Sequence, residues 1–219
     1  MLFDPSLYDL IDLTMSYYVG MPGYAEEQER TVKHDGWNAK QLHLYSHAGT
    51  HMDAPYHFGV SSETIDELPP SNFFSEAWVV HVPIIVDQQL IDHTTVLPIS
   101  DHIKPGQSLL IRTDWSEFVG TPKYRNQLPR ISVSLARWCV EKEVKVLGVE
   151  PPSVADVNNL EEVTEVHQIL LGGKVTIVEG LTNLDCITSS KVTLIALPLK
   201  IENGDGAPAR VFALQERQL

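Results

Sequence analysis

Apolar and polar positions alternate or cluster along several short stretches of the chain, and these patterns predict strands. Residues 40–45 alternate with a period of two, which indicates a half-buried strand. Continuous apolar runs at residues 77–86 and 107–112 indicate buried strands, the second directly after the turn sequence Lys104-Pro105-Gly106. We predict further strands at residues 10–13, 144–149 and 175–178.

Two other segments repeat apolar residues at the spacing of a helix. Residues 134–143 place apolar side chains on one face, with Ser134 as the expected N-cap. Between residues 159 and 173 the apolar positions recur every three or four residues and end at Gly172-Gly173, a helix end and turn. Helices that alternate with apolar strands predict an α/β fold, a mixed β-sheet with flanking helices, in a single domain over residues 1–219.

The composition narrows the class of protein. With 219 residues, 43% of them hydrophobic, the chain is long enough to bury one core, and no linker-like stretch divides it. A formal net charge of −13 argues against nucleic acid or an anionic membrane as the partner. There is no basic leader or membrane-length apolar run, and two cysteines are too few for a disulfide framework. We therefore expect a cytoplasmic protein with reduced thiols.

The densest chemistry is a set of three histidines and one aspartate within eleven residues: His47, His51, Asp53 and His57. Gly49 and Pro55 make a continuous helix through them improbable, so a strand end that leads into a tight loop is expected instead. Imidazole and carboxylate are the usual ligands of zinc, manganese and related ions. Without a cation, so many crowded polar groups would be poorly compensated on burial. The stretch therefore predicts a divalent-metal site with hydrolytic chemistry.

The pattern His-x-Gly-Thr-His-x-Asp-x-Pro-x-His at residues 47–57 resembles the signature of the cyclase family of metal-dependent hydrolases, which includes kynurenine formamidase and isatin hydrolase. The resemblance runs from Asp12-Leu13-Thr14 to Pro208-Ala209-Arg210. It implies a swivelling β/β/α-like fold and a small-molecule amide substrate. Members of the family are commonly dimers or tetramers, so it also implies a homodimer or homotetramer.

The remaining metal ligands follow from the resemblance, because local geometry does not supply them. An ideal helix–strand hairpin places His167 about 7 Å from the turn and Glu179 about 20 Å from it, so spacing alone does not bring the two together. In the family, a histidine and a glutamate twelve residues apart complete the metal site. The resemblance carries this role to His167 and Glu179, which occupy the matching positions.

These residues suggest how the site would work. His47, His51 and Asp53 are assigned to one divalent ion, Zn²⁺ or Mn²⁺, and His167 to a second, with Asp53 and Glu179 as candidate bridges. Such ions lower the pKa of bound water toward neutrality and polarise a carbonyl group, which suits attack on an amide carbon.

Two further residues are assigned to the substrate side. His57 is the expected proton shuttle to the departing nitrogen, and a role as metal ligand stays open. Tyr24 matches an aromatic position that contacts substrate in the family. The residues that follow differ, because kynurenine formamidases carry Trp-Pro-Gly-Asp at this point and this chain has Ala25 and Glu26 after Tyr24. A second departure is Glu150, where relatives often have aspartate.

The favoured function is a metal-dependent amidohydrolase of the arylformamidase type, acting on N-formylkynurenine or a related aryl formamide. The resemblance leaves two other enzymes open: a hydrolase of cyclic amides of the isatin type, and a metal-dependent lyase or cyclase acting on a hydroxy acid. A non-catalytic protein in which the ions only brace the fold is a third alternative. His57 and an aromatic entrance loop argue against it, since neither has a purpose in a closed structural site.

Overall fold

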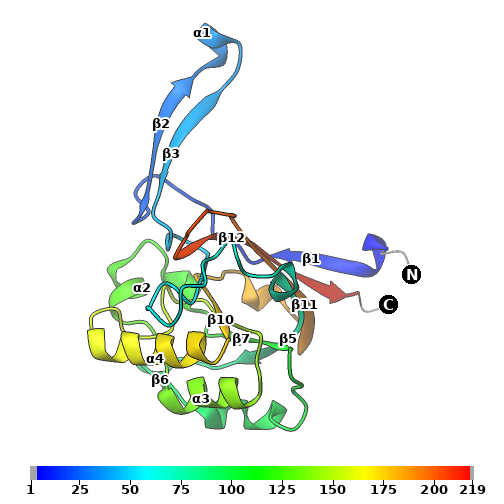
Figure 1. The fold of residues 1–219 in the computed structure, drawn as a ribbon. Helices are drawn as coiled ribbons and strands as arrows, with labels where there is room; N and C mark the ends of the chain where they lie inside the picture. Colours follow the sequence, from blue (N-terminus) through cyan, green and yellow to red (C-terminus); the bar gives the residue numbers. More distant parts are fainter. Residues whose placement is uncertain (1–3, 218–219) are drawn as a thin grey trace.

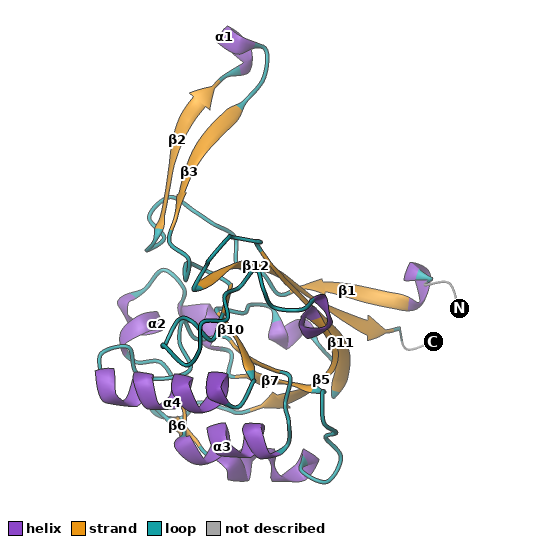
Figure 2. Cartoon of the chain, in the orientation of Figure 1, coloured by secondary structure: helices purple, strands orange, loops and turns teal. Residues whose placement is uncertain are grey.

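The computed structural model describes residues 4–217, and most of its strands form one mixed sheet closed into a barrel (Figures 1 and 2). Seven strands follow one another in the order β12-β11-β5-β7-β9-β10-β4, and β4 pairs back onto β12. The strand β1 adds to the outer edge of β12. The strands are β1 (Tyr8–Asp12), β4 (His51–Asp53), β5 (Phe74–His81), β7 (Ser108–Arg112), β9 (Val146–Val149), β10 (Thr176–Glu179), β11 (Lys191–Pro198) and β12 (Gly206–Glu216).

The four strands β5, β7, β9 and β10 pair in parallel, and the other pairs of the barrel are antiparallel. Two longer helices, α3 (Val133–Glu141) and α4 (Leu160–Gly172), pack against each other and cover the parallel strands (Figure 1). The expected α/β fold with a mixed sheet and flanking helices is confirmed.

Successive residues of the parallel strands belong to two different cores, as the period of two requires. On β9, Val146 packs with the core inside the barrel and Leu147 packs with the core under α3 and α4. On β10, Val178 and Ile177 divide between the two cores in the same way. Because both faces of these strands are covered, their sequences are almost uniformly apolar.

Shorter elements connect the barrel strands. A two-residue ladder joins β6 (Leu90–Ile91) to β8 (Arg130–Ile131), and α2 (Pro122–Asn126) lies in the connection before β8. The 3-10 helices are η1 (Pro5–Leu7), η2 (Pro70–Phe73), η3 (His93–Ile99), η4 (Trp115–Phe118) and η5 (Leu184–Cys186). Among residues 4–217, no helix has the length and apolar character needed to cross a bilayer.

A two-stranded arm projects from the barrel (Figures 1 and 2). It consists of β2 (Tyr24–Arg30) and β3 (Ala39–Leu44), joined at the tip by the short helix α1 (Val32–Asp35). The alternation at residues 40–45 correctly predicted a strand, but the expected half-burial is wrong, because every residue of β3 after Ala39 is exposed. Within residues 4–217, the two strands of the ribbon pack mainly against each other.

Three boundaries differ from those expected. The strand at residues 77–86 is β5, which starts earlier and ends at His81, before Pro83. The N-cap of α3 is Ser132, whose hydroxyl accepts a hydrogen bond from the Leu135 N–H at 3.1 Å, so the assignment to Ser134 is wrong. Asn159 caps α4 in the same way, and Gly173 ends that helix as expected.

Candidate metal centre

The short strand β4 carries two of the expected ligands on one face. His51 and Asp53 are two residues apart and therefore point to the same side, whereas Met52 between them points into the barrel core. In the antiparallel pair of β4 and β10, Glu179 lies directly opposite His51. Barrel closure therefore places three of the expected ligands next to one another.

The turn before β4 requires glycine at two contacting positions. Gly49 has φ +61°, and Gly180, directly after Glu179, has φ +68°. A Cβ atom on Gly180 would lie 2.4 Å from the carbonyl oxygen of Gly49, so only glycine permits this approach. The hydroxyl of Thr50 donates to the Gly180 carbonyl at 2.5 Å and fastens the turn to the end of β10.

His167 reaches the same place from the helix α4. Its Nε2 atom lies 3.3 Å from Oε1 of Glu179 and 3.7 Å from Oδ2 of Asp53. Sequence spacing alone does not supply this contact; the packing of α4 against β10 brings His167 to Glu179 (Figure 1). The ring of Phe58 stacks on His167 with centroids 4.2 Å apart, which fixes the plane of the imidazole.

The two carboxylates are shared among three imidazoles. Glu179 Oε2 lies 3.1 Å from His51 Nε2, and Asp53 Oδ1 lies 3.6 Å from the same nitrogen. Asp53 Oδ1 is also 2.9 Å from His47 Nδ1. Two sets of donor atoms arise, each within 4.8 Å, and Asp53 belongs to both: His47, His51 and Asp53 in one, Asp53, His167 and Glu179 in the other.

Hydrogen bonds on the far side of two rings fix which nitrogen faces the centre. His51 Nδ1 lies 3.0 Å from the Gly49 carbonyl oxygen, and His167 Nδ1 lies 2.6 Å from the Val163 carbonyl oxygen. A carbonyl oxygen only accepts, so each Nδ1 carries a proton and each Nε2 faces the carboxylates, to which it donates when protonated and beside which it offers a lone pair to a cation when neutral. This is the arrangement typical of metal-binding histidines.

The donor set fits a divalent cation. Asp53 and His51 are 1% and 2% exposed, and Asp53 Oδ2 has no hydrogen-bond partner among the described residues, although a buried carboxylate oxygen needs one. Burial alone would raise the pKa of Glu179, but hydrogen bonds from His167 and His51 outweigh burial and hold that pKa below its usual range. The buried carboxylates therefore demand positive charge, which protons or a metal ion can supply.

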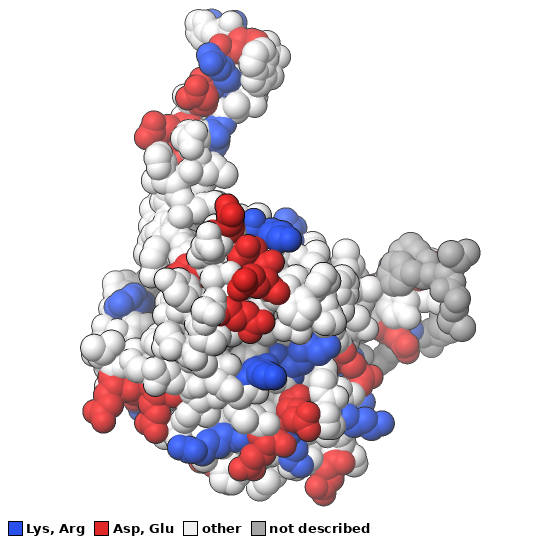
Figure 3. Space-filling view, viewed as in Figure 1, with Lys and Arg blue, Asp and Glu red and all other residues white. Residues whose placement is uncertain are grey.

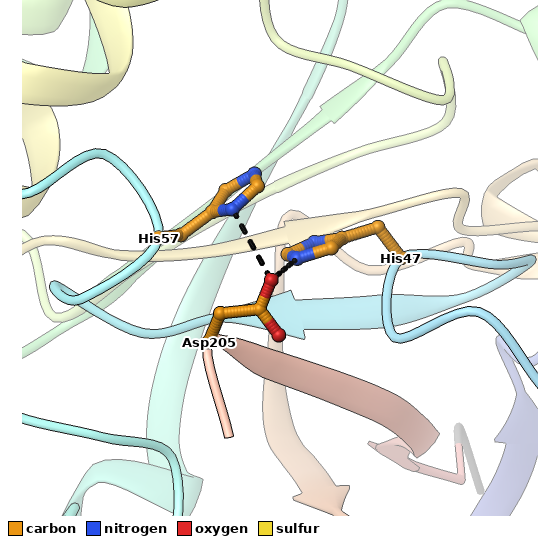
Figure 4. A group of neighbouring side chains, drawn as sticks. All are labelled: His47, His57 and Asp205. Atoms are coloured by element: carbon orange, nitrogen blue, oxygen red, sulfur yellow. Dashed lines mark hydrogen bonds and ion pairs between the residues drawn. The ribbon is translucent and has the colours of Figure 1, made fainter. Parts of the chain in front are cut away.

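His47 and His57 stack beside this centre, with ring centroids 3.8 Å apart (Figure 4). Burial lowers the pKa of His47, but the carboxylates of Asp53 and Asp205 outweigh burial and raise it to about 9. The His57 side chain keeps 23% of its surface exposed and lines the cavity described below. Of the seven expected site residues, the structure brings together six: His47, His51, Asp53, His57, His167 and Glu179.

The centre opens into a cavity of about 640 Å³. Among the described residues that line it, Arg125 is the only lysine or arginine. The aromatic side chains on its walls are Tyr18, Tyr45, Phe58 and Tyr124.

Tyr24, the expected substrate contact, does not line this cavity. Its ring lies against Tyr17, with centroids 5.2 Å apart, and its hydroxyl donates to Glu26 at the base of the arm. The physical reason is that the antiparallel pairing begins at Tyr24, which turns the side chain into the arm. Tyr18, six residues earlier, and Tyr45 take the aromatic positions at the cavity.

Two features of the site were missed in the sequence. Residues 119–126, part of a polar and aromatic stretch whose role the sequence leaves open, form one wall of the cavity. Glu150 anchors that wall: its carboxylate accepts from Thr113 and Ser116, and its carbonyl oxygen accepts from the Tyr124 hydroxyl at 2.7 Å. The second missed feature is Asp205, which contacts both His47 and His57.

The structure therefore combines a mixed barrel with a buried imidazole–carboxylate centre under an aromatic cavity. The chain belongs to the family described as putative cyclase, which it matches over residues 11–156. This confirms the resemblance seen in the motif at residues 47–57.

Individual relatives point the same way. Kynurenine formamidase of Bacillus cereus is 27% identical over 201 residues, which cover 91% of this chain and 87% of the relative. Isatin hydrolase A from Labrenzia aggregata, solved with benzyl benzoate, superposes with a TM-score of 0.88 at 24% identity, over 97% of this chain and 95% of its own. A structure described as a potential metal-dependent hydrolase with cyclase activity gives 0.76 at 23% identity, over 97% and 100%. The names agree with the expected class of enzyme, and the superpositions establish the fold.

Proposed function

We propose that the protein is a metal-dependent hydrolase that cleaves the carbon–nitrogen bond of a small aryl amide, with aryl formamides such as N-formylkynurenine as the preferred class. The observation that carries this proposal is the buried centre, in which two carboxylates face three imidazoles and Asp53 Oδ2 has no hydrogen-bond partner among the described residues. The name of the Bacillus cereus relative supports the formamide class.

The residues present would hold two divalent ions, Zn²⁺ or Mn²⁺, which both suit imidazole and carboxylate ligands. His47 and His51 would bind one ion and His167 the other, with Asp53 and Glu179 between them. When bound, the ions supply hydroxide at neutral pH and polarise the scissile carbonyl. The protein contributes fixed imidazole tautomers, and a centre whose buried ligands exclude bulk water.

His57 is the group placed to handle the proton of the reaction. It borders the cavity and is not one of the residues grouped around the buried carboxylates of Asp53 and Glu179. Burial holds its pKa below the usual value for histidine. A neutral imidazole at this position accepts a proton from the attacking water and delivers it to the departing nitrogen. The alternative role of His57 as a ligand is tested below.

The cavity suits an aromatic substrate that carries an anionic group. Tyrosine and phenylalanine side chains line its walls. Among the described residues, Arg125 hydrogen-bonds to the side chains of Asn126 and Asn158 and has no carboxylate partner. A cyclic amide of the isatin type is the second candidate, because the same walls fit a fused aromatic ring. A hydroxy acid is the third, since it offers a carboxylate but no aryl group.

We also infer that the protein works as a homo-oligomer in the cytoplasm, with the arm as a contact between subunits. An isolated two-stranded ribbon is only marginally stable in water, and this one exposes Trp37, Leu42 and Leu44. Figure 3 shows charges of both signs toward the end of the arm and an uncharged stretch where it joins the body. The free cysteines Cys139 and Cys186 suit a reducing compartment.

The decisive experiment is a substrate panel on protein whose metal content has been measured. Formanilides, N-formylkynurenine, isatin and simple hydroxy acids are offered to the Zn²⁺-loaded, Mn²⁺-loaded and chelator-treated protein. We expect formamide hydrolysis that disappears with the metal and returns on its addition. Hydrolysis that persists without metal, or turnover of hydroxy acids alone, contradicts the proposal.

A further inference from the structure

We propose that Asp205 is a positioning residue that orients both His47 and His57 at the metal centre. The kinetic part of this proposal rests on the proposed function, whereas the orientation of the rings does not. Asp205 immediately precedes β12, the strand that pairs with β4, and it lies 158 residues after His47 in the sequence. Figure 4 shows its carboxylate at the edges of the two stacked imidazoles.

The first contact selects the tautomer of His47. Asp205 Oδ2 lies 3.0 Å from His47 Nε2, and the other ring nitrogen, Nδ1, lies 2.9 Å from Asp53 Oδ1. Once Asp53 serves a metal ion, the Nε2 proton belongs to Asp205, because a carboxylate accepts and does not donate. Nδ1 then faces the centre with its lone pair free.

His47 is therefore the mirror case of the other two histidines. His51 and His167 donate through Nδ1 to backbone carbonyls and face the centre with Nε2. His47 faces the centre with Nδ1. Within residues 4–217, its outward nitrogen, Nε2, has the Asp205 carboxylate as its hydrogen-bond partner and no backbone carbonyl. A carboxylate behind the ring also raises the basicity of the imidazole, which strengthens its bond to a cation.

The second contact concerns His57. Its Nδ1 atom lies 3.6 Å from the same oxygen of Asp205, longer than a hydrogen bond but close enough for the carboxylate to attract the Nδ1–H dipole. The carboxylate thereby favours the ring orientation in which Nδ1 is turned to Asp205 and Nε2 remains for the substrate. A base whose ring is oriented by a third group is the recurrent arrangement in enzymes that transfer protons.

The backbone holds Asp205 in place independently of its side chain. Its carbonyl oxygen accepts a hydrogen bond from the Ala54 N–H at 3.0 Å, and the next residue, Gly206, pairs with Asp53. A Cβ atom on Gly206 would lie 2.7 Å from Cε1 of His47, so the ring rests directly on this glycine. Asp205 is therefore at a fixed junction between β12 and the motif.

A different role for Asp205 makes a distinct prediction. His47, His57 and Asp205 can together bring three donor atoms within 4.8 Å, which would suit a ligand role. If Asp205 were a metal ligand, its loss would remove bound metal at saturation. If it only positions the rings, the metal stays and binds less tightly.

The test compares Asp205→Asn with the matched control Asp66→Asn. Asp66 Oδ1 accepts from the Asn203 N–H at 3.1 Å, so it holds the same loop but has no contact with a histidine. Nitrogen-15 spectra of histidine-labelled, Zn²⁺-loaded protein report the tautomers. We expect the Nε2–H signal of His47 to shift or vanish in Asp205→Asn and to stay in Asp66→Asn.

Two further readouts complete the test. At saturation, Asp205→Asn should bind the same number of Zn²⁺ ions as the wild type, with affinity about 10–100-fold weaker by chelator competition. Formamide turnover should fall by a similar factor in kcat, with KM little changed. The proposal is overturned if Asp205→Asn keeps the His47 signal and wild-type affinity, if it loses a metal equivalent, or if Asp66→Asn behaves identically. If the wild type hydrolyses no amide, the proposed function fails, and the spectra and affinities still decide the role of Asp205.

Discussion

The metal centre and the arm are neighbours in the sequence and opposites in structure. The arm ends at Leu44, and His47 follows three residues later. The centre is held between β10 and β12 and almost excluded from solvent, whereas the arm pairs only with itself and is exposed on both faces. Both segments alternate polar and apolar residues. The difference shows that alternation specifies a strand, and that only a neighbouring element decides whether the strand is buried.

The largest expected effect comes from breaking the centre. Asp53 belongs to both sets of donor atoms, so Asp53→Asn removes a negatively charged ligand from both proposed ion positions. We expect kcat to fall by about 1000-fold or more, since the charge stabilisation at stake is several kcal/mol. Metal analysis should show depleted protein. Glu27→Gln on the arm, whose carboxylate pairs only with the exposed His43, is the control and should leave both values unchanged.

His57 offers the next largest effect. His57→Ala should reduce kcat by about 100-fold to 10,000-fold, the usual contribution of a proton-transferring group. The metal content should remain that of the wild type, because His57 lies outside the pair of buried carboxylates. The control is His43→Ala, which removes an exposed imidazole of the arm. Loss of metal from the His57 variant would make this residue a ligand instead.

Gly206 tests how tightly the centre is packed. The new methyl group of Gly206→Ala would lie 2.7 Å from both His47 Cε1 and the Met52 carbonyl oxygen. Overpacking of this kind costs about 1–3 kcal/mol of unfolding free energy, which denaturant titration will measure. Gly172→Ala is the control: its methyl group would make only an ordinary contact of 3.6 Å with Val60, so stability should hold or rise. Equal stability of the two variants would contradict the packing at His47.

Much of the centre could be predicted from the sequence because its information is local. The motif at residues 47–57 places its ligands on one short strand and the turn before it, and Gly49 marks that turn. His167 and Glu179 needed the family resemblance, since the angle between α4 and β10 is a property of the barrel. Asp205 could not be found locally, because barrel closure alone brings it to His47.

The errors in the prediction have equally physical causes. Residues 40–45 were expected to be half-buried because their pattern matches that of a covered strand, but nothing in residues 4–217 covers them. Tyr24 was assigned to the substrate because it matches an aromatic position of the family, yet it pairs with Leu44 at the base of the arm and does not line the cavity. In both cases the residue pattern was identified correctly, but the contacts of these residues with neighbouring elements were not predicted.

Arg125 sharpens the comparison with a smaller effect. Arg125→Gln should raise KM about tenfold for an ortho-carboxylated formanilide, the loss expected from about 1.4 kcal/mol of charge-assisted hydrogen bonding. The KM for unsubstituted formanilide should not change, and this difference between substrates is the measurement. Arg137, which forms no ion pair within residues 4–217 and does not line the cavity, provides the control variant Arg137→Gln. A uniform change for both substrates would remove Arg125 from substrate selection.

The smallest effect on the centre is expected from shortening the arm. Residues 27–41 can be replaced by Asn-Gly, because Glu26 and Leu42 are paired and a two-residue turn can join them. Metal content should stay unchanged, since no residue of the removed stretch contacts the ligands. Sedimentation should show dissociation into monomers. A shortened chain that keeps its oligomeric state would exclude the arm as the subunit contact.

The strand β4 has only three residues, yet it joins the two ends of the barrel and supplies two of the ligands. A ligand that binds His51 and Asp53 therefore also stabilises the strand pairing that closes the barrel. An ion that binds the closed barrel more tightly than the open one stabilises the closed barrel by the difference in binding free energy. Metal binding and closure of the barrel are then thermodynamically linked. In metal-free protein, the pairing of β4 with its neighbours would be the least stable part of the barrel.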